Sequence, residues 1–398
     1  MNEIQRRRVL WAAIALPLIA YVFVLQHWAH NIPYNDDIPD ILLFILTLGD
    51  ASSFSESLQA VLAPHNDHRT SASRLIYALV YTLEGDIDFR SLTFVANTAI
   101  VGLFALLAYQ VRGANRLLVL LILSLLLFQP RAFGPMFCVM CGFAFFYVNL
   151  YGLASLSLLK KPAPLPFLLA VVCAVLATYS LASGQLIWPA GLAWLLYLKW
   201  HHQQPWSYPL AWLAAAIICL YLYQYGWDKP NNTADVIELL MASPLFILRF
   251  GLAIAGSAFA WGMAPLAEAA GLILVAYLGW TTCKTFRSGL SPLHLFAWYA
   301  LGQCFVIAMG RAPYAAVMDD PMFFAIVPRY SFISLCLVAP MLVLALNNTQ
   351  PDKDQKVRLA LVATLLFSLS SYWHYLPQIH AHWEHRLKFY NTGQYRLL

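Results

Sequence analysis

Charge is scarce in this sequence. Only 11% of its 398 residues are Asp, Glu, Lys or Arg, whereas 61% are hydrophobic. A soluble domain with this balance has too few charged groups to cover its surface. The scarcity therefore excludes an ordinary soluble enzyme and indicates a membrane protein. The net charge of +5 reflects basic linkers between apolar runs, so it gives no support for nucleic-acid binding.

Cysteine is also sparse. The sequence has seven cysteines, and each lies at or within an apolar run. This placement argues against a disulfide framework and favours cysteines that pack as small apolar side chains. Cys138 and Cys141 have the Cys-x-x-Cys spacing of redox and metal pairs. Because this pair stands alone in an apolar sequence, we expect both side chains to line a helix.

An internal repeat is not evident either, which weakens the case for a transporter built from two related halves. What the sequence does have is apolar runs long enough to cross about 30 Å of hydrocarbon. They predict an all-α polytopic membrane protein, a single integral membrane domain over 1–398, with about eleven transmembrane helices and a range of ten to thirteen. The runs lie at 9–26, 92–111, 116–130, 135–159, 163–181, 185–199, 208–225, 264–283, 292–310, 330–346 and 357–373.

One further run, 243–260, leaves the count open. If it spans the membrane, the basic loop Lys284–Arg287 becomes external. If it lies at the interface or re-enters the membrane, that loop returns to the cytoplasm. The second arrangement fits the positive-inside tendency better, and Arg249 within the run favours it too.

The distribution of basic residues predicts the orientation of the chain. Arg6, Arg7 and Arg8 precede the first run, which has no small-x-small cleavage site after it and is expected to remain as a span. The N-terminus is then cytoplasmic. Residues 27–91 form a long first external loop carrying the candidate catalytic residues, and 374–398 form a short external tail. Within the loop, 38–48 and 71–82 are expected to form short interfacial helices.

Two adjacent carboxylates open the external loop. Asp36 and Asp37 stand between the first span and the predicted interfacial helix 38–48. A carboxylate at this position can deprotonate an acceptor hydroxyl or hold a divalent cation. The alternative is an acidic pair that only solvates the loop.

A polar string lies further along the same loop. It consists of His65, Asn66, Asp67, His68 and Arg69, and is followed by Arg74. These groups can bind a sugar through paired hydrogen bonds, and the two arginines can steer an anionic phosphate. The alternative is a helix start in which Asp67 is the cap and the histidines are exposed.

Two arginines flank another external loop, near the C-terminal third of the chain. Arg311 ends one apolar run, and Arg329 with Tyr330 begins the next. Guanidinium groups offer a planar fork of donors that suits a phosphate or diphosphate. An equally supported alternative is that both arginines merely extend from helix ends toward the interface. Asp319 and Asp320 can also pair with them, which would give the loop a structural role.

Two remaining features have mainly structural interpretations. Ser183-Gly184-Gln185 is a turn whose small residues let lipid or sugar approach the backbone, although a simple hairpin is the favoured interpretation. In the tail, His380 and His382 have the spacing of a metal pair. They lack a clear third and fourth ligand, so we expect an amphipathic interfacial tail.

In this layout the chain resembles the GT-C class of polytopic membrane glycosyltransferases, in particular bacterial members that use a polyprenyl-linked donor. The resemblance rests on a short cytoplasmic N-terminus, a first span, and a long first external loop that begins with an acidic pair. The strings that carry it are Tyr34-Asn35-Asp36-Asp37, His65-Asn66-Asp67-His68-Arg69, Ser183-Gly184-Gln185, Gly310-Arg311 and Arg329-Tyr330-Ser331. The first loop has no clean Asp-x-Asp motif.

The resemblance implies transfer of a sugar from a polyprenyl-phosphate-linked donor to an extracytoplasmic glycan, lipid or protein. Asp36 or Asp37 is then the general base of an inverting displacement, and Arg311, Arg329 and Arg69 stabilise the departing phosphate. No cofactor is certain, and a divalent cation, Mg²⁺ or Mn²⁺, stays open. The expected location is a bacterial inner (plasma) membrane rich in lipid partners, with the active site facing the periplasm or exterior.

Two other classes compete with this hypothesis. A flippase or transporter of lipid-linked saccharides needs polar groups at membrane depth, and the spans hold few besides Glu268, His294 and Gln303. A membrane acyl- or phospho-group transferase would use His65 or His68 of the loop as its base. Substitution of these histidines separates the last class from a mechanism based on an aspartate.

Overall fold

The computed structural model describes residues 2–34, 36–66, 68–226, 233–347 and 354–391, and every regular element within them is helical. The elements are, in chain order, α1 (Glu3–Trp28), η1 (Ile38–Leu42), α2 (Leu43–Gly49), α3 (Phe54–Leu62), α4 (Ser71–Glu84), α5 (Phe89–Gln110), α6 (Arg116–Leu127), η2 (Pro130–Ala132), α7 (Phe133–Phe137), α8 (Val139–Leu158), α9 (Pro164–Thr178), η3 (Ala182–Leu186), α10 (Ile187–His202), α11 (Ser207–Gln224), α12 (Thr233–Ala242), α13 (Pro244–Gly256), η4 (Ser257–Phe259), α14 (Ala264–Thr285), α15 (Pro292–Ala315), η5 (Phe323–Ile326), α16 (Pro328–Asn347) and α17 (Asp354–Asn391). The predicted all-helical fold is confirmed for these residues.

Long apolar helices dominate the described part of the chain. By length and composition, nine segments are able to cross a membrane: α1, α5, the segment from α6 to α7, α8, α11, α14, α15, α16 and α17. The shorter α9 and α10, with 15 and 16 residues, pack against α8 in the same bundle. Each of the apolar runs predicted to span therefore lies on helix, and the chain is an integral membrane protein.

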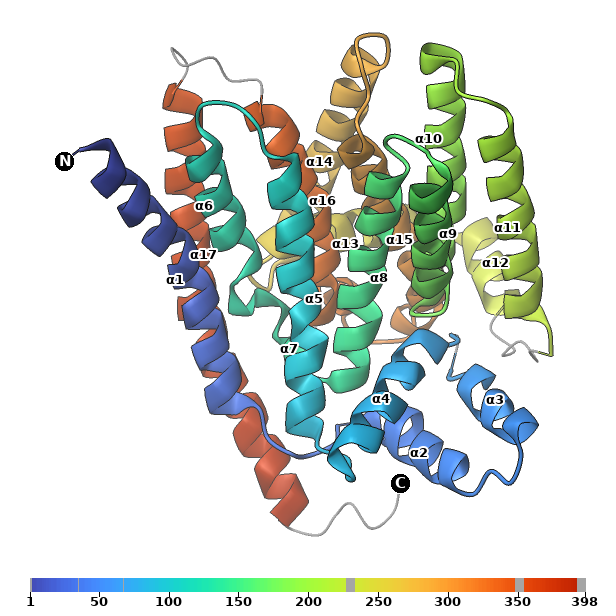
Figure 1. Ribbon diagram of the computed structural model, residues 1–398. Coiled ribbons are helices and arrows are strands. Elements are labelled where there is room, and N and C mark those ends of the chain that lie inside the picture. The colour runs from blue at the N-terminus through green and yellow to red at the C-terminus, as the bar shows by residue number, and fades with distance from the viewer. Residues whose placement is uncertain (1, 35, 67, 227–232, 348–353, 392–398) are drawn as a thin grey trace.

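The basic linkers between the long helices lie at one end of the bundle. In Figure 1 the helices alternate in direction, and the turns after α5, α8, α10 and α14 lie together at the upper end. We call this end the basic end, because its linkers carry Arg112, Arg116, Lys160, Lys161 and Arg287. The helices η1 to α4 lie at the opposite end, which we call the loop end.

The run that sequence left ambiguous forms α13 and η4. The segment Val236–Ala242 and the segment Pro244–Phe259 are bent by 107° with respect to each other, so they do not continue as one straight helix. Helix α13 packs very closely on α14. A Cβ atom on Gly256 would lie 2.0 Å from the Ala267 carbonyl oxygen, and one on Gly271 would lie 2.0 Å from the Leu252 oxygen. Only glycine permits this backbone contact, which holds α13 inside the bundle.

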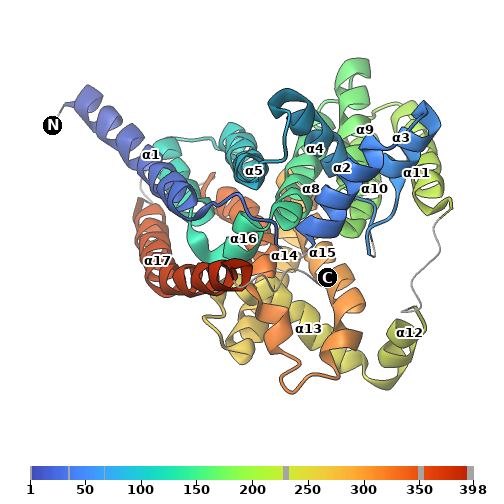
Figure 2. The same ribbon diagram turned by 90° about the horizontal axis from the view of Figure 1, so that it is seen from below.

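The first loop folds into a helical layer with its own apolar core. The predicted interfacial helices at 38–48 and 71–82 are present as η1 with α2 and as α4, while α3 was not foreseen. Their buried side chains form a cluster with the first turns of α5 and α8 that includes Ile41, Phe44, Tyr77, Phe89 and Phe143. Figure 2, the view from below, shows this layer over α8, α9 and α10. The loop is therefore fixed to the bundle rather than free in solvent.

Helix α17 extends beyond the predicted span. The sequence suggested a span at 357–373 followed by a separate tail, but the helix continues without a break to Asn391. Its C-terminal turns pack on the end of α1 and the segment after it through edge-on rings. Trp28 lies 5.2 Å from His380, His30 lies 4.8 Å from Trp383, and Tyr34 lies 5.2 Å from His382, all between ring centroids. The tail thus covers the start of the first loop.

Candidate functional site

Asp37 is anchored at the beginning of α8. Its side chain is fully buried, and its carboxylate accepts backbone N–H groups from Met140 at 2.8 Å and Tyr34 at 3.0 Å. Met140 is in the first turn of α8, whose N–H groups have no helical acceptor and carry partial positive charge. Burial is the largest influence on this carboxyl and raises its pKa to about 7, although the two N–H donors and Arg386 act in the opposite direction.

Asp36 lies beside the start of α16. Its side chain is half-buried, and it interacts electrostatically with the guanidinium of Arg329, the second residue of α16. Tyr330 is 1% exposed and interacts electrostatically with Arg311, which lies four residues before the end of α15. These electrostatic interactions relate residues of the first loop to residues on both sides of the α15–α16 connection. We call Asp36, Asp37, Arg311, Arg329 and Tyr330 the loop-end cluster.

Arg329 is the arginine of this cluster whose N–H donors are available to a ligand. Its guanidinium lies near the rings of Phe324 and Tyr330, at 5.8 and 5.9 Å from their centroids. Within the described ranges no hydrogen bond or ion pair engages its nitrogens, and none of them is fully buried. A half-buried guanidinium with available donors is suited to an anionic group such as a phosphate.

The two cysteines of the Cys-x-x-Cys sequence lie in the same region. Cys138 is the N-cap of α8, and its sulfur accepts the backbone N–H of Cys141. The two Sγ atoms are 2.7 Å apart, and the Cys138 thiol also points to Asp37 Oδ1 at 3.8 Å. Both sulfurs interact electrostatically with Arg329. The sequence predicted cysteines that line a helix; they instead form its first turn and adjoin the loop-end cluster.

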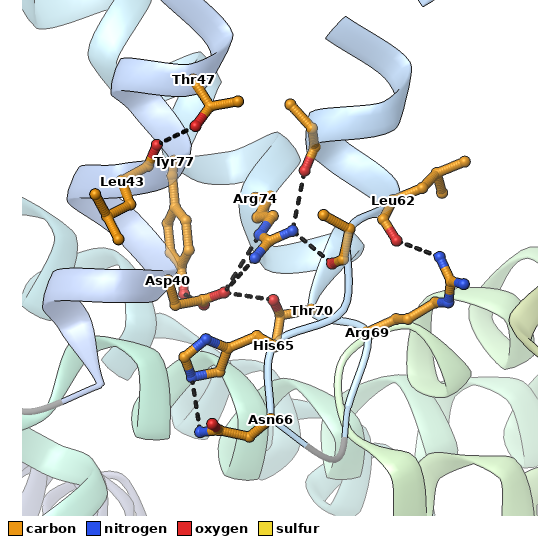
Figure 3. Close-up of polar contacts among 12 residues, drawn as sticks. Asp40, Leu43, Thr47, Leu62, His65, Asn66, Arg69, Thr70, Arg74 and Tyr77 are labelled. Atoms are coloured by element: carbon orange, nitrogen blue, oxygen red, sulfur yellow. Dashed lines mark hydrogen bonds and ion pairs between the residues drawn. The ribbon is translucent and has the colours of Figure 1, made fainter. Parts of the chain in front are cut away.

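Arg74 is used inside the first loop, as Figure 3 shows. It forms a buried ion pair with Asp40 at 3.2 Å, and its Nη1 donates to the carbonyl oxygens of Ala60 and Ala63. Asp40 also accepts the Thr70 hydroxyl at 2.6 Å. The hydrogen-bond donors of Arg74 are thus bonded to η1 and to the end of α3. This favours a structural role for Arg74 over the predicted steering of a phosphate. Asp40, which sequence reasoning missed, is the only carboxylate in the apolar interfacial helix 38–48.

Arg69 likewise ties two parts of the protein together. Its Nε donates to the Tyr223 carbonyl at 2.8 Å, its Nη2 to that of Tyr225 at 2.6 Å, and its Nη1 to Leu62. The side chain is 6% exposed. The first two acceptors lie at the C-terminal end of α11, where carbonyl groups lack helical donors and favour a cation. This placement favours a cap on α11 over direct contact with a ligand.

The remaining residues of the polar string form a tight turn. The backbones of His65 and His68 exchange two hydrogen bonds, at 2.8 and 2.9 Å, and Asn66 adopts a positive φ of 48°. The Asn66 amide lies 3.1 Å from His65 Nε2 (Figure 3). Helix α4 begins at Ser71 with no side-chain cap from Thr70. Asp67, the other predicted member, lies outside the described residues.

Gln185 is connected to this turn through α11. It lies in η3 and hydrogen bonds the Tyr223 hydroxyl, which itself accepts the Arg69 backbone N–H at 3.1 Å. A Cβ atom on the neighbouring Gly184 would lie 1.9 Å from the Ala177 carbonyl oxygen, so this turn is closed tightly against α9. Gln185 therefore joins Arg69, and the structure does not bring it into the loop-end cluster by any described contact.

The end of α17 supplies a cation near Asp37 that sequence reasoning did not single out. Arg386 is 3% exposed and stacks between the rings of Tyr34 and Trp383, each 4.0 Å from its guanidinium carbon. It donates to the Ile32 carbonyl at 3.4 Å and interacts electrostatically with Asp37. The histidines of this segment pack on aromatic rings, and no metal cluster of three or more His, Cys, Asp or Glu side chains is found in the described part of the chain.

Polar groups on the helices of the bundle are mostly paired with one another. Arg249 and Glu268 form a two-pronged ion pair at 2.8 and 3.0 Å. Gln303 connects Ser183 to Asn149 through buried hydrogen bonds. A buried arginine that the sequence did not highlight, Arg131, is surrounded by the rings of Trp261, Phe367 and Tyr375 and donates to the Ser371 hydroxyl.

An apolar cavity of about 490 Å³ adjoins this arginine. It lies between α6, η4, α16 and α17, and its lining includes Leu126, Trp261, Val338, Leu342 and Phe367. Trp261 and Phe367 separate the cavity from the Arg131 guanidinium. Apart from the Thr364 and Ser370 hydroxyls, the cavity presents hydrocarbon and aromatic surface.

Comparison with known proteins adds no relative: no family model, no curated protein and no solved structure matches this chain.

Proposed function

We propose that this protein is a membrane glycosyltransferase that moves a sugar from a polyprenyl-phosphate-linked donor to an extracytoplasmic acceptor, with inversion at the anomeric carbon. The loop-end cluster is the proposed site. The observation that carries the proposal is the electrostatic interaction of Asp36 with Arg329, because it relates a carboxylate that can act as a base to a guanidinium with available donors.

The proposal includes an orientation. The basic end faces the cytoplasm and the loop end faces the periplasm or exterior, in accordance with the positive-inside tendency. The chain then crosses the membrane eleven times, and α12 with α13 enters from the loop end and returns to it. The 107° bend between them and the close packing of α13 on α14 support this arrangement.

The two carboxylates take different roles in this proposal. Asp36 is half-buried and interacts with Arg329, so it is the one placed to accept the proton of an acceptor hydroxyl. Asp37 is fully enclosed, with its oxygens bound by N–H groups, and positions the loop. Arg329, with Arg311 nearby, stabilises the charge that develops on the departing lipid phosphate.

The apolar cavity offers a place for the lipid part of the donor. Its residue Val338 lies on α16, nine positions after Arg329, or about 13 Å along the helix axis. A polyprenyl chain lying in the cavity thus has its phosphate within reach of the start of α16. Hydrocarbon surface of this kind excludes a hydrated sugar and accepts an isoprenoid.

The alternatives remain a lipid-linked saccharide flippase and a membrane acyl- or phospho-group transferase. A flippase needs a polar path through the bundle, whereas Arg249 with Glu268 and Gln303 with Asn149 bond to each other. A histidine-based transferase needs an available imidazole, whereas His65 is 6% exposed and bonds to Asn66. His65→Ala and His68→Ala are expected to weaken transfer without abolishing it.

The test compares three carboxylate variants of the purified, membrane-reconstituted protein. Each is assayed with a panel of polyprenyl-phosphate sugars that differ in the sugar. Asp36→Asn is expected to lower transfer at least about 100-fold because the base is lost. Asp50→Asn is the matched control, since Asp50 is exposed at the end of α2. Full activity in Asp36→Asn would refute the proposed base, and full activity in Asp37→Asn would refute the positioning role of Asp37.

A further inference from the structure

We propose that Cys138 and Cys141 form a reversible disulfide at the start of α8, by thiol–disulfide exchange with an oxidised dithiol protein or oxidised glutathione. The proposal concerns the loop end of the molecule and its compartment. It does not depend on the glycosyltransferase activity, because its test measures the two sulfurs directly.

The geometry of the pair is the first argument. The Sγ atoms are 2.7 Å apart, so the two side chains point at each other at the start of the helix. Both lie in one helical turn, with Cys138 as N-cap, so little backbone movement is needed to join them. The contact is therefore prepared for a covalent bond rather than for packing alone.

The surroundings of the sulfurs are the second argument. Cys141 is half-buried and reachable by a small oxidant, whereas Cys138 is 4% exposed. The side-chain contact with Cys141 and burial raise the pKa of Cys138, so this thiol keeps its proton and reacts second. Asp37 Oδ1 lies 3.8 Å from the Cys138 sulfur and is placed to take its proton. One attacking thiol, one resolving thiol and one base are thus present.

The exchange is balanced in atoms and electrons. The Cys141 thiolate attacks one sulfur of the oxidant's disulfide, which breaks, and the other sulfur leaves as a thiolate. Cys138 then loses its proton to the Asp37 carboxylate and attacks the Cys141 sulfur, expelling the second oxidant thiolate. The two cysteines lose two electrons and two protons, and the oxidant becomes two thiols.

The proposed location at the outer face supplies the reason for such a bond, because disulfides form and persist in oxidising compartments. The bond also affects the loop-end cluster. In the reduced form the Cys138 thiol donates to Asp37, and the disulfide removes that donor while leaving the Met140 N–H in place. The redox state of the pair therefore changes the hydrogen bonding of the Asp37 carboxylate, which fixes the first loop.

The experiment uses the full-length protein in membranes. Samples are equilibrated with oxidised glutathione or with dithiothreitol, unfolded in an excess of a thiol-alkylating reagent, digested and analysed by mass spectrometry of the fragment that contains residues 138 and 141. After oxidation we expect an unalkylated fragment lacking two hydrogen atoms, and after reduction a doubly alkylated one. Double alkylation in both samples would overturn the proposal.

Two variants distinguish this pair from a general response to oxidant. Cys138→Ser should leave Cys141 either alkylated or glutathionylated, because the resolving thiol is missing. Cys173→Ser, in α9, should leave the oxidised fragment unchanged. If oxidation instead joined Cys141 to another cysteine of the chain in the wild-type protein, the proposal would be wrong.

Discussion

Met140 donates its backbone N–H to the Asp37 carboxylate over 2.8 Å, and this bond joins the segment after α1 to the first turn of α8. The same turn adjoins Arg329, so the position of Asp36 relative to α16 depends on it. The effects of this arrangement on activity, on the pH dependence of stability and on the orientation of the helices can each be measured separately.

Removal of the open guanidinium should affect catalysis more than stability. Arg329→Ala is expected to lower transfer by about 100-fold or more, because a cation that meets developing charge contributes on that scale. Arg329→Lys should restore part of the rate. Arg116→Ala is the matched control, since Arg116 is exposed at the basic end. Steady-state transfer rates decide the matter, and equal rates for Arg329→Ala and Arg116→Ala would contradict the assignment.

The buried carboxyl of Asp37 should make stability depend on pH. Burial raises its pKa to about 7, whereas the unfolded side chain titrates near 3.8. Between these values the folded state keeps a proton that the unfolded state has lost, so stability falls as the pH rises from about 4 to about 7. The whole loss is roughly 4 kcal/mol. Thermal unfolding of wild type and Asp37→Asn in detergent measures it; parallel pH profiles would show that Asp37 does not titrate in this way.

The Asp40–Arg74 ion pair should be important for the stability of the first loop. Asp40→Asn leaves the Arg74 charge buried without its counter-ion, and a loss of about 3 to 5 kcal/mol is expected from such a change. Glu3→Gln breaks the exposed Glu3–Arg7 pair and should change little. Unfolding midpoints of both variants provide the comparison. A similar small effect in the two would mean that the buried pair is not needed.

The proposed orientation can be tested by labelling single cysteines in a cysteine-free background. Ser55→Cys in α3 should react with a membrane-impermeant maleimide in intact cells. Ser288→Cys, between α14 and α15, should react only after the membrane is opened. Both residues are exposed, so access depends on the side of the membrane alone. Reaction of Ser288→Cys in intact cells would mean that α12 and α13 complete a further crossing.

The helices of the bundle follow from the sequence because apolar runs of sufficient length have few alternatives in a membrane. The interfacial helices of the first loop were predictable for a related reason, since their apolar residues recur with helical spacing. Helix α13 was not decided by the sequence. Its placement depends on Gly256 and Gly271 meeting across two helices, and such a close approach between distant residues leaves no local pattern.

The candidate site was predictable in composition and only partly in arrangement. Asp36 and Arg329, both singled out from the sequence, interact electrostatically in the structure, because both lie in segments at one end of the bundle. Arg69 and Arg74 were grouped with them by proximity in sequence. Their acceptors are carbonyl groups of Tyr223, Tyr225, Ala60 and Ala63, and carbonyl oxygens of this kind are available wherever a helix ends. Nothing in the local sequence indicates which helix end lies nearby.

The central claim is that a lipid phosphate binds beside Asp36. The most direct measurement is an experimental structure of the reconstituted protein with a polyprenyl phosphate. We expect the phosphate within hydrogen-bonding distance, about 3 Å, of the Arg329 guanidinium, with the isoprenoid chain entering the cavity between α6, α16 and α17. A phosphate bound among the arginines and lysines of the basic end, with Arg329 unoccupied, would contradict it.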